Sequence, residues 1–262
     1  MLTSTSNAKV KQIVQWQTKA KERKKDKVFL AEGLRMCEES PVELVKEVYL
    51  TEDMLEKAKG DKALWGKLKK TGYETVSRDV FAKMSDTMSP QGILTVLRQP
   101  EYHLEELILA SDTPLFVILE NLQDPGNLGT IIRTGEGAGI TGVIMSRQTV
   151  DIFNPKTIRS TMGSIFRVPF LYVDDLADTI DTLKANHIRV YAAHLKGTEY
   201  FHDTAFNEPC AFMIGNEGNG LQKETADMAD KYVRIPMEGK VESLNAAIAA
   251  SLFMYEAYRQ RH

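Results

Sequence analysis

From residue 115 onward, the chain alternates short apolar runs with helix-forming segments. The strand predicted at Leu115–Leu122 opens with five apolar residues in a row, as expected for a strand buried on both faces of a sheet. Further strand candidates follow at residues 141–146, 168–173, 188–194, 210–215 and 231–236. Strands separated by helices predict an α/β fold whose parallel sheet is covered on both faces. In such sheets ligands bind beyond the carboxyl ends of the strands.

Four helices are predicted between and after these strands. Asn154 followed by Pro155 is a cap and first-turn signal, and predicts a helix to about residue 162. Asp174 is expected to cap a second helix, and Ser243 to open the last one. The predicted helices span residues 127–138, 155–162, 175–186 and 243–257.

The first hundred residues predict a separate, small α/β domain. Asn7 is expected to cap a helix over 7–25, on which Val10, Ile13, Val14 and Gln17 share one face. Strands are predicted at 28–33, 45–50, 73–77 and 92–99, and helices at 51–59 and 78–86. The domain boundaries predicted from this pattern are 1–99, a linker at 100–113, and 114–262.

Composition excludes several classes of protein. No apolar run approaches the roughly 18 residues needed to cross a membrane, and the N-terminus lacks a signal-peptide core. Cys37 and Cys210 lie far apart and outside any CxxC pattern, so we expect buried thiols in a reducing cytoplasm. The five histidines lack metal-ligand spacing, so no metal is expected.

Charge is unevenly distributed along the chain. The formal net charge is −3, yet residues 1–28 hold eight lysines and arginines against two acidic residues, which is eight minus two, or +6. Local basic patches, more than the total charge, make contacts with nucleic-acid phosphates. A solvated helix face explains the same charges, and both interpretations stay open at this point.

The first segment with possible chemistry is Leu119–Gly142, where a buried strand enters a Pro/Gly turn and then a helix. Such turns often cradle phosphate at a helix N-terminus. The dinucleotide fingerprint GxGxxG is missing, because Gly126 and Gly129 give only GxxG. Arg133 lies one turn from this loop, and an ordinary exposed helix arginine is the plain alternative.

The second segment, Ile214–Leu221, follows a strand and contains three glycines in six residues. Glycines there permit close approach of the backbone to a ligand, and Glu217 at the apex offers a carboxylate. A sharp turn without function explains the same composition.

The third segment, Arg234–Ala257, runs from a strand end through a loop into the last helix. Ser243 is a natural N-cap, which would explain that residue without any catalytic role. Asn245 is expected in the first turn, and the alanine-rich run at 246–250 permits close helix packing.

The three segments together, in this order, resemble the SpoU/TrmH family of the SPOUT methyltransferase superfamily. The resemblance rests on N-x5-R at 127–133, on G-N-E-G-x-G-L at 215–221 and on I-P-M-x5-S-L-N-x2-I-A at 235–249. It covers 114–262 strongly. FLAEGLRM at 29–36 and SPQGILTVL at 89–97 also look like the small substrate-binding domain that many members carry.

The resemblance implies a fold and a cofactor. It implies a small N-terminal α/β RNA-binding domain and a C-terminal parallel-sheet domain with a deep trefoil knot. Knots are nearly absent among proteins, so periodicity alone would not have suggested one. S-adenosylmethionine would be held mainly by backbone groups of the second and third motifs, beside the segment 192–197. The implied cofactor residues are Gly215, Asn216, Ile235, Pro236, Met237 and Leu244.

The resemblance also implies a reaction, methyl transfer from S-adenosylmethionine to a ribose 2′-hydroxyl of RNA. The implied catalytic residues are Arg133, Asn127, Glu217, Ser243 and Asn245. Arg133 would remove the hydroxyl proton or stabilise the developing alkoxide, and Asn127 and Glu217 would orient it. Members are usually homodimers, and large-subunit ribosomal RNA is favoured over transfer RNA as the substrate. Two other classes are alternatives: a nicotinamide-dependent oxidoreductase, which needs the missing GxGxxG turn, and a non-catalytic RNA-binding protein.

Overall fold

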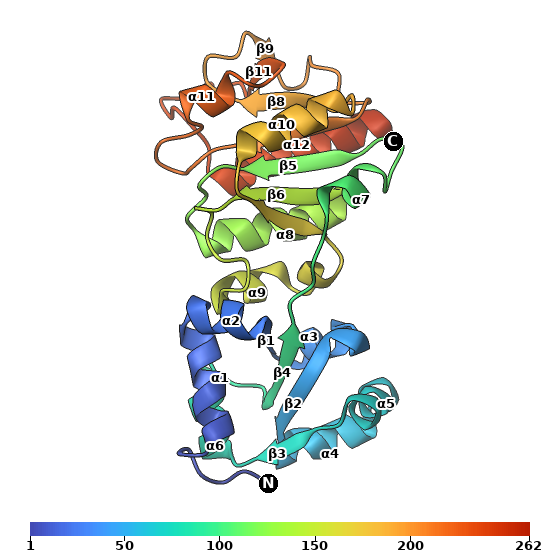
Figure 1. The fold of residues 1–262 in the computed structure, drawn as a ribbon, viewed down its shortest axis with the longest axis vertical. Helices are drawn as coiled ribbons and strands as arrows, with labels where there is room; N and C mark the ends of the chain where they lie inside the picture. The colour runs from blue at the N-terminus through green and yellow to red at the C-terminus, as the bar shows by residue number, and fades with distance from the viewer. The chain divides into compact units, whose positions relative to one another are not determined.

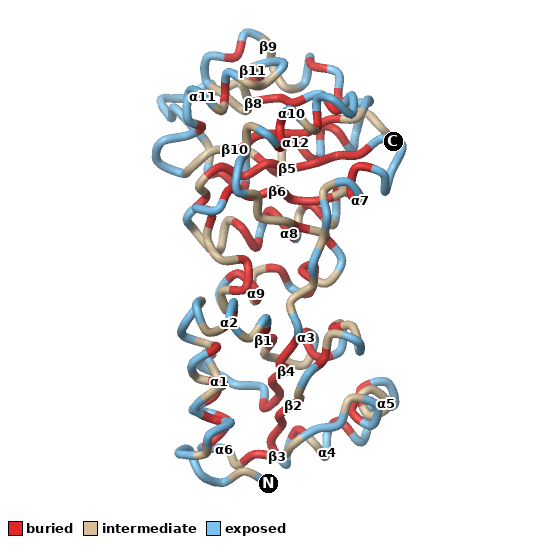
Figure 2. The backbone as a smooth tube through the Cα atoms, viewed as in Figure 1, coloured by how far each residue is buried: buried red, intermediate tan, exposed pale blue.

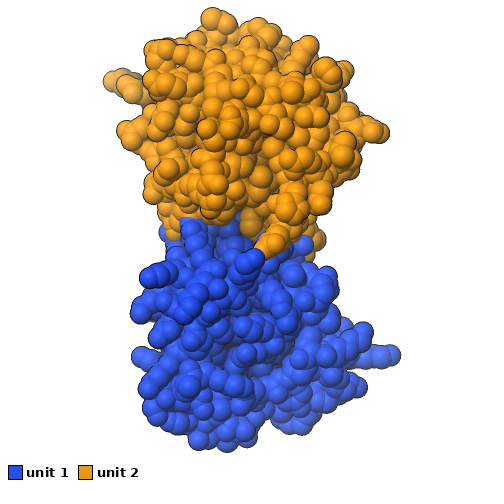
Figure 3. Space-filling view, in the orientation of Figure 1, with its two compact units in different colours: residues 1–100, 151–166 blue, residues 101–150, 167–262 orange.

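The structure, a computed structural model, describes residues 1–262 as two compact units (Figure 3). The first unit contains Met1–Pro100 and Asp151–Phe166, and the second contains Glu101–Val150 and Arg167–His262. Residues 151–166 were expected in the C-terminal domain, but they pack with the first unit. The expected linker also carries a helix, α7 (Leu104–Ile108).

The second unit is built on a seven-stranded sheet in which every pairing is parallel (Figure 1). Its strand order is β7-β6-β5-β10-β8-β11-β9. In chain order the strands are β5 (Leu115–Leu119), β6 (Gly142–Ser146), β7 (Phe170–Val173), β8 (Arg189–Ala193), β9 (Glu199–Tyr200), β10 (Cys210–Ile214) and β11 (Lys231–Arg234). The predicted parallel α/β sheet is therefore confirmed. The trefoil knot stays a prediction.

Helices cover both faces of this sheet. Phe116 and Ile118 of β5 join a core cluster with residues of α7 and α10 (Leu176–Ala185). On the other face α12 (Ala246–Arg261) packs against β10, where the Phe253 and Phe212 rings lie 5.2 Å apart, and α8 (Pro125–Ala138) packs along α12. The central strands of the unit are buried (Figure 2). The second unit also contains one short helix, α11 (Lys223–Ala226).

Three helix starts differ from the prediction, and the first is α8, which begins two residues early because Asp124 caps it. α10 is capped by Asp175, whose carboxylate accepts from the amides of Ala177 and Asp178. Asp174, the expected cap, forms an ion pair with Arg147 instead. The last helix begins at Ala246 and not near Ser243, because the side chain of Asn245 provides the cap.

The first unit contains a four-stranded sheet in the order β1-β4-β2-β3. Its strands are β1 (Val28–Glu32), β2 (Val45–Thr51), β3 (Glu74–Val76) and β4 (Ile93–Arg98). β4 pairs antiparallel with both neighbours, whereas β2 and β3 are parallel. The predicted strands are all present, within one residue at each end.

The helices of the first unit include two that the sequence analysis missed, α3 (Leu34–Glu39) and α5 (Lys62–Thr71). The expected helices over 51–59, 78–86 and 155–162 are α4 (Glu52–Gly60), α6 (Arg78–Met84) and α9 (Pro155–Thr161). The single helix expected over 7–25 is two helices, α1 (Ala8–Thr18), capped by Asn7, and α2 (Ala20–Asp26), because Lys19 between them is extended.

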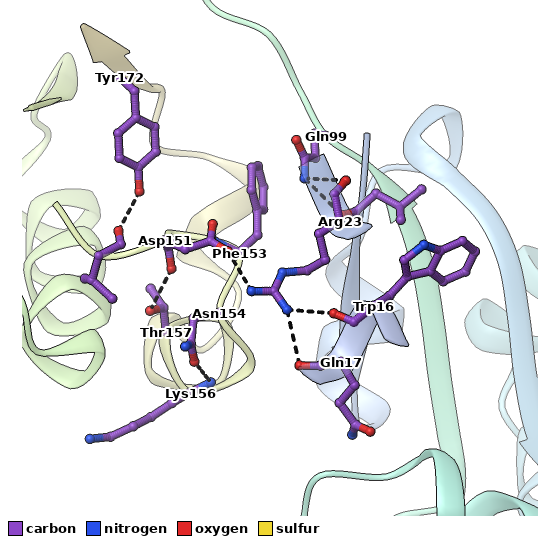
Figure 4. Close-up of polar contacts among 12 residues, drawn as sticks. Trp16, Gln17, Arg23, Gln99, Asp151, Phe153, Asn154, Lys156, Thr157 and Tyr172 are labelled. Atoms are coloured by element: carbon purple, nitrogen blue, oxygen red, sulfur yellow. Dashed lines mark hydrogen bonds and ion pairs between the residues drawn. The ribbon is translucent and has the colours of Figure 1, made fainter. Parts of the chain in front are cut away.

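A buried arginine explains the break between α1 and α2. The Arg23 guanidinium donates to the carbonyl oxygens of Trp16 (2.6 Å) and Gln17 (3.2 Å), near the end of α1 (Figure 4). Carbonyls at a helix end lack partners within the helix, and here a side chain from the next helix satisfies them. Arg23 also pairs with Asp151 at 2.6 Å, with 4% and 15% of the two side chains exposed. This ion pair ties α2 to the segment 151–166.

Replacing Asp151 with alanine should destabilise the first unit by about 3 kcal/mol, because it leaves a buried guanidinium without its counter-ion. Both tryptophans, Trp16 and Trp65, belong to this unit, so tryptophan fluorescence during urea unfolding reports on it alone. A suitable control is Asp53→Ala, because the Asp53–Arg78 pair is 59% and 80% exposed. The control should cost less than ~1 kcal/mol. Equal midpoints for the two variants would contradict the anchoring role of Arg23.

None of the helices combines the length and the apolarity that crossing a membrane requires. Cys37 and Cys210 are free and buried, as expected for structural thiols.

Candidate active site

A cavity of about 380 Å³ lies at the carboxyl ends of three neighbouring strands, β10, β8 and β11. Its walls come from the loops that follow these strands and from the start of α12. The volume falls within the ~300–1,000 Å³ of typical small-molecule sites. A parallel sheet is expected to bind ligands at this edge.

The loop after β10 is a tight hairpin that forms one wall. Asn216 and Gly220 exchange two backbone hydrogen bonds, and the Asn216 side chain accepts from the amides of Gly218 (2.9 Å) and Asn219 (3.1 Å). The Asn216 amide group also donates to the Asn121 carbonyl at 2.9 Å. A Cβ atom on Gly215 would come within 2.1 Å of the Gly220 carbonyl carbon, so this position accepts only glycine.

Three side chains from the three sequence motifs form one polar bridge. The Glu217 carboxylate accepts from the backbone amides of Gln123 (3.0 Å) and Asp124 (2.9 Å) and from the Asn127 side chain (3.0 Å). Asn127 in turn accepts from the Asn245 side chain at 3.0 Å. The bridge therefore connects the start of α8, the hairpin after β10 and the start of α12.

Glu217 is held in its charged form by this bridge. Burial on its own would raise the pKa of Glu217, but the hydrogen bonds from Asn127 and from the backbone amides of Asp124 and Gln123 outweigh it and lower the pKa. Because the folded pKa is depressed, the stabilisation is present above the ordinary carboxyl pKa of ~4.3 and is lost as pH falls through the folded value.

The amide resonances of Gln123 and Asp124 should consequently move together as Glu217 is protonated, with a midpoint below the ordinary glutamate pKa of ~4.3. An NMR titration of the ¹⁵N-labelled protein measures this directly. The Glu217→Gln variant lacks the carboxylate that accepts from both amides, so their joint transition should vanish. Joint movement centred above pH 5 would contradict the bridge.

The expected cofactor residues cluster in the cavity. Gly215, Asn216, Ile235, Met237 and Leu244 all line it, whereas Pro236 lies between two lining residues without contributing to the wall. The main-chain groups of Ile235, Met237 and Leu244 form no hydrogen bonds within the chain. Unpaired main-chain donors and acceptors require a partner. They are therefore available to a ligand in the cavity.

Four of the five expected catalytic residues belong to the cavity or to the polar bridge, and Arg133 belongs to neither. Glu217 and Ser243 line the cavity, and Asn127 and Asn245 join it through the polar bridge. Ser243 is not the cap of α12, so the plain explanation for that residue is wrong; Asn245 takes that role. Arg133 is exposed on α8 and does not line the cavity, and its side chain makes no hydrogen bond within the chain.

The sequence analysis did not single out two polar residues of the cavity, Arg234 and His194. Arg234 lines the cavity with its guanidinium 4.6 Å above the Tyr200 ring, and its Nε atom is buried without a partner. The only signal was its position directly before Ile235 of the third motif. His194 was covered by the expected segment 192–197, and its ring packs 4.6 Å from Tyr232. Its Nδ1 accepts from the Lys196 amide at 3.1 Å.

Comparison with known proteins gives this arrangement a family. The model of the SpoU rRNA Methylase family matches residues 114–255, which include the cavity and the bridge. The chain belongs to the SpoU rRNA methylase family. The model of the MRM3-like substrate binding domain matches residues 7–95. The resemblance drawn from the three motifs is confirmed, and membership argues against the nicotinamide-dependent alternative.

Known members of the family match this chain over nearly its whole length. A Bacillus subtilis protein named 23S rRNA (guanosine(2553)-2′-O)-methyltransferase RlmP is 34% identical, covering 97% of each chain. An AdoMet-bound rRNA methyltransferase from Sinorhizobium meliloti superposes with a TM-score of 0.86 at 31% identity, covering 98% of this chain and 97% of that one. The SpoU methyltransferase AviRb from Streptomyces viridochromogenes, in complex with AdoMet, gives 0.85 at 28% identity, covering 97% and 98%.

Proposed function

We propose that this protein transfers a methyl group from S-adenosylmethionine to a ribose 2′-hydroxyl of RNA. The observation that carries the proposal is the single cavity in which residues of the second and third motifs meet, connected to the first motif through Glu217, Asn127 and Asn245. The names of the SpoU relatives support both the cofactor and the ribose position.

The residues present fit S-adenosylmethionine. The cavity combines a glycine hairpin, apolar side chains and the unpaired main-chain groups of Ile235, Met237 and Leu244, which suits a nucleoside held by backbone contacts. Gly215, Asn216 and Pro236 would complete its surroundings. When bound, the cofactor supplies a methyl group already activated on a sulfonium, so the chain's own residues need only bind and orient the reactants.

The acceptor needs help, because a ribose hydroxyl is a weak acid. Arg133 is assigned to the hydroxyl oxygen, where a guanidinium stabilises developing negative charge. A general-base role is harder, since arginine is effectively always protonated. Glu217 and Asn127 hold the first-motif loop in place, and Ser243 and Asn245 shape the start of α12 at the cavity wall.

The active form is proposed to be a homodimer. Arg133 lies outside the cavity of its own chain, so a second copy could bring it to a cavity. α12 leaves Ile248 (50%), Tyr255 (49%) and Tyr258 (41%) exposed, and α8 packs beside it. An exposed apolar patch on a helix is typical of an interface.

Large-subunit ribosomal RNA is the proposed substrate, and transfer RNA is the alternative. The Bacillus subtilis relative is named for a 23S rRNA site, and it matches this chain over both units. Ribosomal RNA as a substrate would place the protein in the cytoplasm.

Incubation with labelled S-adenosylmethionine and total RNA from a strain lacking the gene tests the proposal. Label in large ribosomal RNA after size separation is the expected result. Label confined to transfer RNA would keep the chemistry and replace the substrate. The absence of both RNA labelling and cofactor binding would contradict the proposed function.

A further inference from the structure

The second helix of the first unit separates its charges by face. Lys21, Lys24 and Lys25 are exposed, and their i, i+3 and i+4 spacing places them on one side of α2. These three residues are called the lysine face. None of the three forms a salt bridge within the chain. Arg23 lies about 200° around the helix from Lys21, at 100° per residue, and it is buried.

α2 contains two acidic residues: Glu22, in its first turn, is half-buried, and Asp26, at its end, is turned toward α1. The Asp26 carboxylate accepts from the indole Nε1 of Trp16 at 2.7 Å and from the Gln12 side chain at 3.1 Å. Its negative charge is therefore held in the contact between the two helices, and it does not pair with the lysine face. Part of the positive charge of residues 1–28 is therefore concentrated on the exposed lysine face.

Internal contacts also fix the position of the lysine face. Arg23 binds two carbonyl oxygens of α1 and the Asp151 carboxylate, and the Gln99 side chain donates to the Arg23 carbonyl at 3.4 Å (Figure 4). A seven-residue helix in isolation would be marginal. Anchored in this way, it presents its lysines from a rigid base.

We propose that the lysine face binds the phosphate backbone of the RNA substrate; this rests on the proposed function. Lysine ammonium groups bind phosphates as point charges, and such contacts position an RNA without reading its sequence. Protein interfaces instead deplete lysine and need an apolar core. The lysine face contains no apolar side chain, so it favours RNA over an acidic protein.

The test replaces Lys21, Lys24 and Lys25 together with glutamine, which removes charge and keeps helix propensity. The matched control makes the same change at Lys57, Lys62 and Lys70, which are exposed on α4 and α5 of the same unit. Affinity of the full chain for a large-subunit ribosomal RNA transcript is measured over a range of salt concentrations. Tryptophan fluorescence confirms folding of both variants.

The lysine-face variant should bind RNA about 10-fold more weakly near 0.1 M salt, and the slope of log K against log salt should fall by about 2. The control should stay within about 2-fold of the wild type. Equal losses in both variants would overturn the proposal, as would unchanged RNA affinity with reduced binding of poly-glutamate. S-adenosylmethionine affinity of the wild type is measured separately, so failure of the proposed function is distinguishable from failure of this inference.

Discussion

The Arg133→Ala variant should lose methyl transfer while its affinity for S-adenosylmethionine stays within a few-fold of the wild type. Cofactor affinity should survive because Arg133 is exposed and lies outside the cavity, and its side chain makes no hydrogen bond or ion pair within the chain. No residue that lines the cavity is held in place by the Arg133 side chain.

Transfer should fall because the ribose oxygen gains negative charge as its proton departs. Removing one well-placed donor to such an oxygen costs roughly 100- to 1,000-fold in rate. Arg133→Lys should recover only part of this loss, since an ammonium lacks the planar fork of a guanidinium. Single-turnover transfer to RNA and calorimetric titration with S-adenosylhomocysteine separate the two effects.

Arg189→Ala is the matched control. Arg189 is also exposed in the second unit, but it lies at the start of β8, at the end of the sheet away from the cavity. Its loss should leave both transfer and cofactor affinity unchanged. If the Arg133→Ala variant failed to bind cofactor, or transferred methyl groups at the wild-type rate, the assignment of Arg133 would be wrong.

Gly215→Ala should abolish cofactor binding and, with it, transfer. The added Cβ would stand 2.1 Å from the Gly220 carbonyl carbon and 2.2 Å from the Leu221 nitrogen. These are backbone atoms, so the hairpin must open to accommodate them. Opening would move the wall formed by Gly215 and Asn216 and strain the two backbone bonds between Asn216 and Gly220.

Gly218→Ala in the same hairpin provides the comparison. Its Cβ would meet only the Asn216 Oδ1 atom at 3.5 Å, which is ordinary contact. That variant should bind S-adenosylhomocysteine within about 3-fold of the wild type, a difference below 1 kcal/mol. Similar affinities for the Gly215→Ala and Gly218→Ala variants would show that the hairpin is not a cofactor wall.

Local pattern predicted the sheet well, because a strand buried on both faces must be apolar along its whole length. Leu115–Leu119 is entirely buried, as its continuous run indicated. The three motifs likewise predicted which loops meet, since loops after neighbouring parallel strands share one edge.

Long-range contacts explain what the pattern missed. The break at Lys19 depends on Arg23 reaching back to α1 and across to Asp151, a partner 128 residues away. Nothing within 7–25 signals that contact, because arginine is usually exposed. The late start of α12 has a similar cause: Asn245 caps the helix while its amide also donates to Asn127, 118 residues away.

The most direct test of the central claim locates the transferred methyl group on the nucleotide. RNA labelled by the enzyme is hydrolysed in alkali, which cleaves each linkage through the free 2′-hydroxyl beside it. A 2′-O-methyl group blocks that cleavage, so label should appear in alkali-resistant dinucleotides. Label recovered in mononucleotides would place the methyl group on a base and contradict the account.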